Sequence, residues 1–454
     1  MPPRWLLSIL SILLVIGLLV SQAQPEERYY KEFSQFSQVL DIVKGRYVTE
    51  VDTKKLFQGA YQGMLEQLDS YCQFFDVPEL KEFKEDTTGE FGGLGIQIDM
   101  RDGVLTVVAP IEGTPAWKAG ILPGDKILYI NGKTTERITL QEAIRTLRGS
   151  AGSSVTLTVR HPGSDVDTNI TIVRSVIKPK VVEGKVVHDS PKIGLIRVQS
   201  FTAEMMTEFD KVAETLSKEK IGGLILDLRG NPGGLLDAAV ALADRFLDKG
   251  VIVSVKGRTA NKVYEATPGM LFGNMPVIVL MDAGSASASE IAASALQGNK
   301  RAMVVGMPSF GKGAVQNVIQ LEDGGAVKLT TAMYYTPRGT PITREHPVEP
   351  DVTITVPTEA MIALRNQETE DRMRHEEEIL IQEKKSKETP GGSPTKEQKQ
   401  TKSETPAPAG QPAAPQAPDR RKRVRDLQIE GAVAILVGQI DACLARGVTP
   451  SPVK

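Results

Sequence analysis

Apolar positions change their spacing several times along the chain, and each change marks a predicted boundary. Between residues 29 and 90 they recur every three or four positions, which is typical of amphipathic helices that need a partner surface. From residue 91 to 176 they form short β-rich runs separated by Gly-Asp and Asn-Gly turns, with one helix at 139–148. We therefore expect a helical N-terminal region that supports dimerisation, followed by a compact β domain.

Residues 177–356 alternate short apolar runs with segments of helical periodicity. The short runs predict strands at 192–198, 223–228, 276–281 and 302–305. The periodic segments predict helices at 203–218, 235–247 and 287–296. Such alternation predicts a layered α/β core, so the expected fold class is a multidomain α/β protein.

The composition changes after residue 356. Residues 357–419 are first charged and then rich in Lys, Thr, Pro, Ala and Gln, and such an insert cannot bury enough apolar surface to fold. Residues 420–447 begin with a basic run and continue as an amphipathic helix. The basic run is either a solvated linker end or a docking patch for anionic lipid. The helix is expected to return and pack on the body or on a second subunit.

Residues 1–23 have the features of an export signal. Arg4 precedes an apolar run at 5–20, and small residues at 21–23 suit cleavage. The rival interpretation is an uncleaved membrane anchor, because the run is only slightly shorter than a spanning helix. Both place the body outside the cytoplasm, in the periplasm, either free or tethered to the inner membrane.

Composition and charge exclude several classes of function. The 454 residues carry a formal net charge of -2, so no nucleic-acid partner is expected. The cysteines are Cys72 and Cys443, which excludes a disulfide framework and a cysteine-cluster metal site; both are expected to be buried thiols. The four histidines lack the paired spacing of zinc ligands, so we expect no metal.

A turn crowded with small residues follows the strand at 276–281. It holds three serines, Ser285, Ser287 and Ser289, just before a predicted helix. This geometry exposes a hydroxyl, and the amides at the helix start can stabilise negative charge on an attacked carbonyl. Alternatively, Ser285 or Ser287 only caps the helix, with Glu290 at the capping-box position. The residues alone leave both interpretations open.

A serine nucleophile needs a base, and no histidine lies in a context that marks it as one. Lys312 lies between glycines in Ser309-Phe310-Gly311-Lys312-Gly313. To act near neutral pH its pKa must fall by about 3 units, which burial away from carboxylates can provide. Gln316 is suited to orient the amine, because an amide does not stabilise the charged form. A surface loop lysine is the alternative.

A glycine-rich turn follows the strand at 223–228. A bare amide of Gly233 or Gly234 can serve as a second oxyanion donor. The alternative is that the segment is only a tight left-handed turn. It is not a phosphate-binding loop, because it lacks the Gly-Lys-Ser/Thr ending of such loops. Asp227 and Arg229 are expected to pair with each other.

The β domain carries two stretches typical of PDZ modules. Residues 91–96 resemble a carboxylate loop, in which Gly93, Leu94, Gly95 and Ile96 would bind a terminal carboxylate. Residues 119–132 resemble the Ala-Gly-x-x-x-Gly-Asp-x-Ile-x-x-Ile-Asn-Gly signature. The module either binds peptide or only rigidifies its neighbour.

The order of these motifs resembles that of the carboxy-terminal processing, or tail-specific, peptidases. The resemblance covers about residues 33–356 and the Asp426-Leu427-Gln428 stretch, and the insert at 365–418 departs from it. It implies a crotonase-like core and selects Ser287, 25 residues before Lys312, as nucleophile. Lys312 would then be the general base and Gln316 its orienter. The oxyanion hole would comprise the amides of Ala288 and of Gly233 or Gly234.

The resemblance implies an exported serine endopeptidase that forms an acyl-enzyme, needs no cofactor and cleaves protein substrates with accessible C-terminal tails. We also expect a homo-oligomer, with an adaptor left open. Arg148, at the end of the helix beside the PDZ groove, would be a regulatory residue that reaches Gln316 when ligand binds; otherwise it faces solvent. The alternatives of another class are a catalytically silent PDZ scaffold and a crotonase-like acyl-CoA enzyme.

Overall fold

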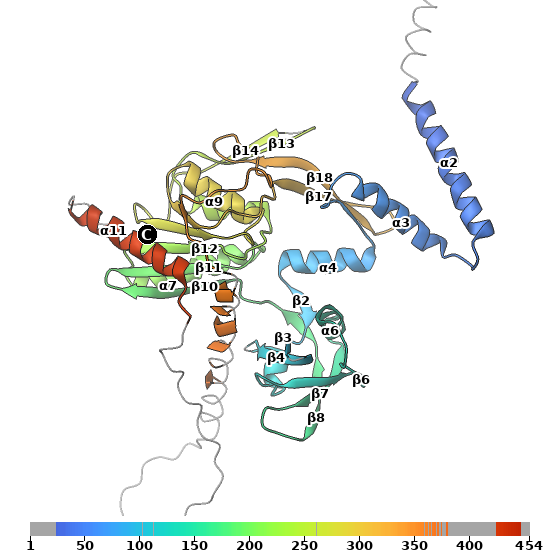
Figure 1. Cartoon of the computed structure of the whole chain (residues 1–454), viewed down its shortest axis with the longest axis horizontal. Helices are drawn as coiled ribbons and strands as arrows, with labels where there is room; N and C mark the ends of the chain where they lie inside the picture. The colour runs from blue at the N-terminus through green and yellow to red at the C-terminus, as the bar shows by residue number, and fades with distance from the viewer. Residues whose placement is uncertain are drawn as a thin grey trace, which may run out of the picture. The chain divides into compact units, whose positions relative to one another are not determined.

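The computed structural model describes residues 24–101, 103–111, 113–259, 261–357 and 424–445, with scattered positions between 359 and 379 (Figure 1). The predicted signal segment, most of the insert and the basic run at 420–423 lie outside the described residues. The chain divides into two compact units. The first comprises Met1–Asp76 and Asn317–Leu329, and the second comprises Val77–Gln316 and Thr330–Lys454.

The first unit is built on two helices, α2 (Gln24–Arg46) and α3 (Thr53–Glu66). Asp52 caps α3 by accepting hydrogen bonds from the amides of Lys54 and Lys55. The short strand β1 (Gln73–Phe75), which the sequence did not predict, pairs antiparallel with the first residues of β18 (Ala326–Tyr335). The predicted buried thiol of Cys72 is confirmed, whereas the side chain of Cys443 lies outside the described residues.

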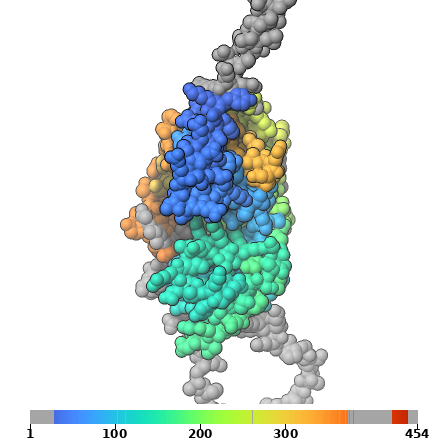
Figure 2. All heavy atoms as spheres, turned by 90° about the vertical axis from the view of Figure 1, so that its right-hand side faces the viewer, coloured from blue at the N-terminus to red at the C-terminus, as the bar shows by residue number. Residues whose placement is uncertain are grey.

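The β domain follows helix α4 (Val77–Thr88) and is coloured teal in Figure 2. It forms its own apolar core. Its main sheet has the order β3-β4-β5-β7-β8, with β6 paired to β5, and β2 pairs separately with β9. The expected helix is α6 (Leu140–Leu147), which Thr139 and Glu142 begin as a capping box. The remaining elements are β2 (Phe91–Gly93), β3 (Ile96–Arg101), β4 (Val104–Pro110), α5 (Pro115–Lys118), β5 (Lys126–Ile130), β6 (Lys133–Thr134), β7 (Ser154–Arg160), β8 (Asp167–Val173) and β9 (Ser175–Ile177).

The α/β core is built on a six-stranded sheet of order β10-β11-β12-β15-β16-β19. The strands are parallel from β11 onward, and β10 is antiparallel to β11. Parallel strands end at the same edge of a sheet, so the loops after β12, β15 and β16 meet there. These strands are β10 (Val182–Asp189), β11 (Lys192–Val198), β12 (Gly223–Asp227), β15 (Val277–Met281), β16 (Met303–Gly306) and β19 (Val352–Thr353).

Helices cover both faces of this sheet. Helices α7 (Met205–Lys218), α8 (Leu236–Asp244) and α9 (Ala288–Gly298) pack on one face. Helix α11 (Leu427–Ala445) packs on the other, where Ala432, Leu436 and Ile440 contact strand residues (Figure 1). The terminal helix thus returns and packs on the body, which is one of the two arrangements expected from the sequence.

Further strands in this region were not predicted from the sequence. Strand β13 (Val251–Gly257) pairs with β14 (Asn261–Glu265) and with the last residues of β18, and β17 (Ala314–Gln320) also pairs with β18. In the part of the chain that the structure describes, no helix combines the length and apolarity needed to cross a bilayer.

Candidate active site

The serine-rich turn connects the carboxyl end of β15 to α9, and its three serines differ in their surroundings. Ser285 and Ser289 are buried: the Ser285 hydroxyl donates to Leu228 O at 2.8 Å, and the Ser289 hydroxyl donates to Asn231 O at 2.9 Å. Ser287 is half-buried and precedes the helix with φ 55° and ψ -112°. Such a backbone is rare for a residue with a side chain and is typical of functional turns.

Glu290 joins this turn to the lysine loop. It is fully buried, and its Oε2 accepts hydrogen bonds from the amides of Ser287 at 2.7 Å and Lys312 at 2.8 Å. Its Oε1 accepts from the Ser309 hydroxyl at 2.5 Å and from the Gly311 amide at 2.7 Å. Ser287 therefore begins α9 and is joined through Glu290 to the loop that carries Lys312.

Lys312 lies in the loop between β16 and β17, which is packed closely on a neighbouring segment. A Cβ on Gly313 would stand 2.0 Å from Ile342 O, and one on Gly311 would stand 2.4 Å from Thr343 O, so only glycines fit on either side of Lys312. Burial lowers the pKa of the Lys312 amine, and the nearby Glu290 charge partly opposes that shift. Gln316 lies in β17, four residues after Lys312.

The glycine-rich turn after β12 also reaches the serine turn. A Cβ on Gly233 would stand 2.8 Å from the Ser287 Cβ and 2.9 Å from the Ala288 amide nitrogen. The Gly233 amide donates to the Asn231 side chain at 2.9 Å. Gly234 instead lies against the backbone of Phe201, where an added Cβ would stand 2.3 Å from the carbonyl oxygen. The structure thus brings Gly233, Ser287 and Ala288 together.

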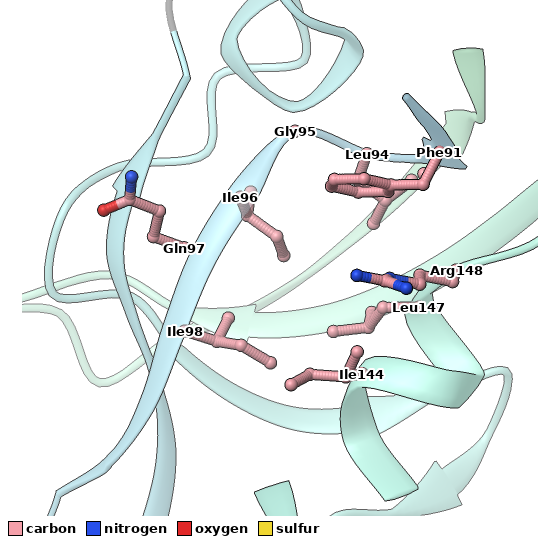
Figure 3. A pocket seen from close by; sticks show the side chains of 10 residues that line it. Phe91, Leu94, Gly95, Ile96, Gln97, Ile98, Ile144, Leu147 and Arg148 are labelled. Carbon is pink, nitrogen blue, oxygen red and sulfur yellow. The ribbon is translucent and has the colours of Figure 1, made fainter. Parts of the chain in front are cut away.

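The β domain has an apolar pocket of about 280 Å³ between β3 and α6 (Figure 3). Gly93, Leu94, Gly95 and Ile96, the residues expected to bind a carboxylate, all line it. The other lining residues are Phe91, Gln97, Ile98, Ile144, Leu147 and Arg148.

Arg148 follows α6 in the lining of this pocket. Its guanidinium carbon lies 4.4 Å from the centre of the Phe91 ring, and its Nη1 donates to Asp86 Oδ1 at 3.0 Å. Figure 3 shows the guanidinium pointing along the Phe91 ring at the end of α6.

Comparisons with known proteins agree along most of the chain. A profile described as Peptidase family S41 matches residues 192–354, a PDZ domain profile matches 106–161, and a profile of the N-terminal domain of the activating protease CtpB matches 17–78. A carboxy-terminal-processing protease of Bartonella bacilliformis is 44% identical over 338 residues, covering 73% of this chain and 77% of that protein. The chain belongs to the carboxy-terminal processing proteases.

Two further similar proteins share lower identity with this chain. The carboxy-terminal processing protease CtpB of Bacillus subtilis is 35% identical over 340 residues, covering 74% of this chain and 70% of its own. A solved structure of a photosystem II D1 C-terminal processing protease is 28% identical, with a TM-score of 0.44. The match covers 69% of this chain and 86% of that protein. This chain is accordingly a serine-type, carboxy-terminal processing protease with a PDZ domain, which removes the silent-scaffold and acyl-CoA alternatives.

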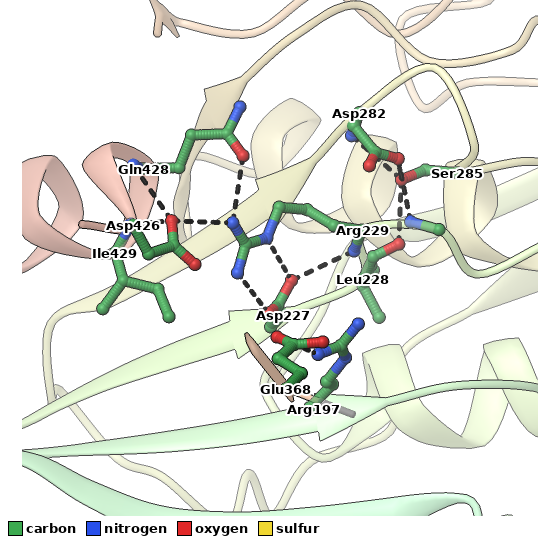
Figure 4. Close-up of polar contacts among 11 residues, drawn as sticks. Arg197, Asp227, Leu228, Arg229, Asp282, Ser285, Glu368, Asp426, Gln428 and Ile429 are labelled. Atoms are coloured by element: carbon green, nitrogen blue, oxygen red, sulfur yellow. Dashed lines mark hydrogen bonds and ion pairs between the residues drawn. The ribbon is translucent and has the colours of Figure 1, made fainter. Parts of the chain in front are cut away.

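Two parts of the protease site were not predicted from the sequence. The capping-box position of Glu290 was recognised, but its bonds to the lysine loop 19 to 22 residues later were not. The expected Asp227–Arg229 pair forms, with Arg229 Nη2 2.7 Å from Asp227 Oδ2, and it also contacts Asp426 and Gln428 (Figure 4). The only signal in the sequence for these contacts was that the Asp426-Leu427-Gln428 stretch resembles the family.

Among the described residues, no cluster of three or more His, Cys, Asp or Glu side chains could hold a metal.

Proposed function

We propose that this protease cleaves peptide bonds through an acyl-enzyme, with Ser287 as nucleophile and Lys312 as general base. The observation that carries the proposal is the Glu290 carboxylate, which holds the backbones of both residues through one oxygen while burial lowers the pKa of Lys312. A lysine made neutral by burial can accept the serine proton, and a serine at a helix start lies beside amides that stabilise an oxyanion.

In the proposed reaction, Ser287 Oγ attacks the carbonyl carbon of the substrate and its proton passes to Lys312 Nζ. The amide of Ala288 and that of Gly233 or Gly234 hold the oxyanion of the tetrahedral intermediate; for Gly233 this requires its amide to leave the Asn231 side chain, to which it donates at 2.9 Å. Lys312 then returns the proton to the leaving amine as the C–N bond breaks. Water, deprotonated by Lys312, then attacks the acyl carbon, and Lys312 returns that proton to Ser287 Oγ as the ester bond breaks. The Gln316 amide orients the lysine, and no cofactor takes part.

The PDZ pocket is proposed to select substrates by their C-terminal tails. The apolar lining suits an apolar last side chain, and the amides near Gly93 and Gly95 suit its carboxylate while the tail adds as a strand beside β3. Arg148 is proposed to report occupancy of this pocket to the catalytic lysine through Gln316. That role requires Arg148 to leave Asp86.

Export, oligomerisation and any membrane tether belong to the same proposal. The apolar run at 5–20 supports export with or without cleavage. Apolar residues on α2 support a subunit contact, because Tyr29, Tyr30 and Phe33 are each more than 70% exposed within the described chain. An adaptor protein would act on the PDZ module or its substrate.

The catalytic assignment is tested with Ser287→Ala and two matched controls, Ser285→Ala and Ser289→Ala. Ser287→Ala should abolish cleavage of an unstructured protein substrate and keep the fold. Each control removes a buried hydrogen bond to a carbonyl, so it should lower the free energy of unfolding by about 1 kcal/mol and keep the enzyme active. Full activity of Ser287→Ala, or loss of activity in a control that remains folded, would show the assignment wrong.

A further inference from the structure

Arg229 lies between the end of β12 and the start of α11, two segments almost 200 positions apart in the sequence (Figure 4). On one side, its Nε and Nη2 donate to the two oxygens of Asp227 at 2.8 and 2.7 Å. On the other side, its Nη1 donates to Asp426 Oδ1 at 2.9 Å and to Gln428 Oε1 at 3.1 Å. Arg229 is therefore held by groups from both of these segments.

The charges in this cluster are removed from water. The side chain of Asp227 is 1% exposed and that of Arg229 is 13% exposed. Burial alone would lower the pKa of Arg229, but Asp227 and Asp426 together raise it above its ordinary value. The guanidinium thus stays charged, and it needs its partners because a buried charge with a missing partner is unfavourable.

Gln428 extends the cluster to two more strands. It is 3% exposed, and its Nε2 donates to Ile354 O, just after β19, at 2.9 Å. A Cβ on Gly306, at the end of β16, would stand 3.3 Å from the same Nε2. One side chain of the terminal segment therefore hydrogen-bonds to the backbone just after β19 and to the arginine that follows β12, and it lies close to Gly306 at the end of β16.

The segment that follows Arg229 is the glycine-rich turn of the active site. The Gly230 amide donates to Asp282 Oδ1 at 2.8 Å, and Asn231 O accepts from the Ala286 amide at 3.0 Å. Gly233 then packs directly on Ser287. A displacement of Arg229 would consequently be transmitted through residues 230–233 to the backbone around the nucleophile.

We propose that Asp426 and Gln428 are positioning residues of the protease, which hold Arg229 and through it the oxyanion turn against Ser287. The active-site geometry thereby depends on docking of a segment that enters the fold only after the insert. This inference rests on the catalytic roles proposed above for Ser287 and the glycine-rich turn.

The test separates this role from the part that Asp426 plays in starting α11. Asp426 Oδ1 also accepts from the amides of Gln428 and Ile429, as a helix cap does. Asp426→Ser keeps a good cap but is too short to reach Arg229, Asp426→Asn keeps both contacts without the charge, and Asp426→Ala removes both. Arg425→Ala is the matched control, because Arg425 pairs with Glu430 on the exposed side of the same helix start.

We expect kcat to fall about 10-fold in Asp426→Ser and Asp426→Ala, and by less in Asp426→Asn. The KM should not change, because misplacement of an oxyanion donor affects the transition state more than substrate binding. Arg425→Ala should match the wild type. Measurements are made on the full chain, below the temperature at which any variant begins to unfold. Should Asp426→Ser not fold, Gln428→Met, which keeps the side-chain length, carries the same expectation.

A second measurement distinguishes failure of this inference from failure of the proposed function. A peptidyl aryl phosphonate, which reacts with a nucleophilic serine, should label Ser287 in every variant, and mass spectrometry locates the label. The labelling rate of Asp426→Ser should be about 10-fold lower than that of the wild type. Labelling of another serine would reject the catalytic assignment itself. Wild-type kcat and labelling rate in Asp426→Ser, or an equal loss in Arg425→Ala, would overturn the positioning role and leave the assignment standing.

Discussion

One oxygen of Glu290 accepts hydrogen bonds from the backbone amides of both Ser287 and Lys312, at 2.7 and 2.8 Å. The two proposed catalytic residues are therefore held relative to each other by a buried carboxylate, and their loops also contact each other through the Phe310 amide, which donates to Ser285 O at 3.0 Å. The same negative charge opposes the effect of burial on the pKa of Lys312. Glu290 thus fixes the geometry of the site and raises the pH at which the buried lysine becomes neutral.

Replacing this carboxylate should lower activity and move its pH dependence. In Glu290→Gln one acceptor oxygen becomes an NH2 group that faces amide donors, so we expect kcat/KM to fall about 100-fold. The loss of the charge lowers the pKa of Lys312 further, and the residual activity should rise at lower pH than in the wild type. The measurement is kcat/KM against pH.

The capping box of α6 offers a matched control for Glu290→Gln. Glu142 accepts from the Thr139 amide at 2.9 Å in the same local geometry, but at the surface of the PDZ domain. Glu142→Gln should keep the wild-type pH profile. A Glu290→Gln enzyme with unchanged rate and profile would show that the shared oxygen is not part of the catalytic geometry.

The wild-type pH profile should follow the neutral form of Lys312. Because burial lowers its pKa below the ordinary value of about 10.4, kcat/KM should rise through a single ionisation on the alkaline side of neutrality and below that value. The folded state binds this proton less tightly than the unfolded chain, so the contribution of Lys312 to stability rises with pH between the two pKa values. Lys312→Arg should be inactive, since a guanidinium stays protonated. Inhibition by EDTA that zinc reverses would contradict a metal-free mechanism.

The sequence was sufficient for features that local patterns encode. The strand at 192–198, the helix that Thr139 begins and the serine turn were all predicted, because periodicity and turn residues within a short window determine them. The contacts of Arg229 with Asp426 and Gln428 were not, since no local pattern records a pairing across the insert. The strands β13 and β18 were missed for the same reason, because they form a sheet only with each other and with other unpredicted strands.

Gly233 should tolerate no side chain. An added Cβ would meet Ala286 O at 2.6 Å and the Ser287 Cβ at 2.8 Å, and its φ of +100° is unfavourable for alanine. We therefore expect Gly233→Ala to push the turn away from the nucleophile and to lower kcat at least 100-fold. The measurement is kcat on a short peptide at a temperature where the variant is folded.

Gly230→Ala distinguishes crowding from backbone strain in the same turn. Gly230 also has a positive φ, +66°, but nothing lies within 4 Å of its added Cβ. Strain alone should cost about 1 kcal/mol of stability and far less activity. Equal losses of kcat in the two variants would mean that strain, and not contact with Ser287, explains the requirement for glycine at 233.

Control by the PDZ domain is expected to depend on the contacts of Arg148. Arg148 donates to Asp86 at 3.0 Å and lies on the Phe91 ring, so its proposed contact with Gln316 requires both interactions to break. Asp86 is 61% exposed, and such an ion pair is worth at most about 1 kcal/mol. Asp86→Asn should therefore raise turnover of a short peptide, too small to reach the PDZ pocket, by about 2- to 5-fold.

Arg148→Ala should have the opposite effect. It removes the group that the proposed active state needs, so cleavage of a long, tail-bearing substrate should fall while binding of the tail to the PDZ pocket is unchanged. Arg145→Ala, on the same helix α6, is the control and should resemble the wild type. The measurements are initial rates on the long and short substrates, with tail binding followed separately. If Arg148→Ala cleaves the long substrate at the wild-type rate, Arg148 has no part in activation, and its contact with Asp86 only fixes the end of α6.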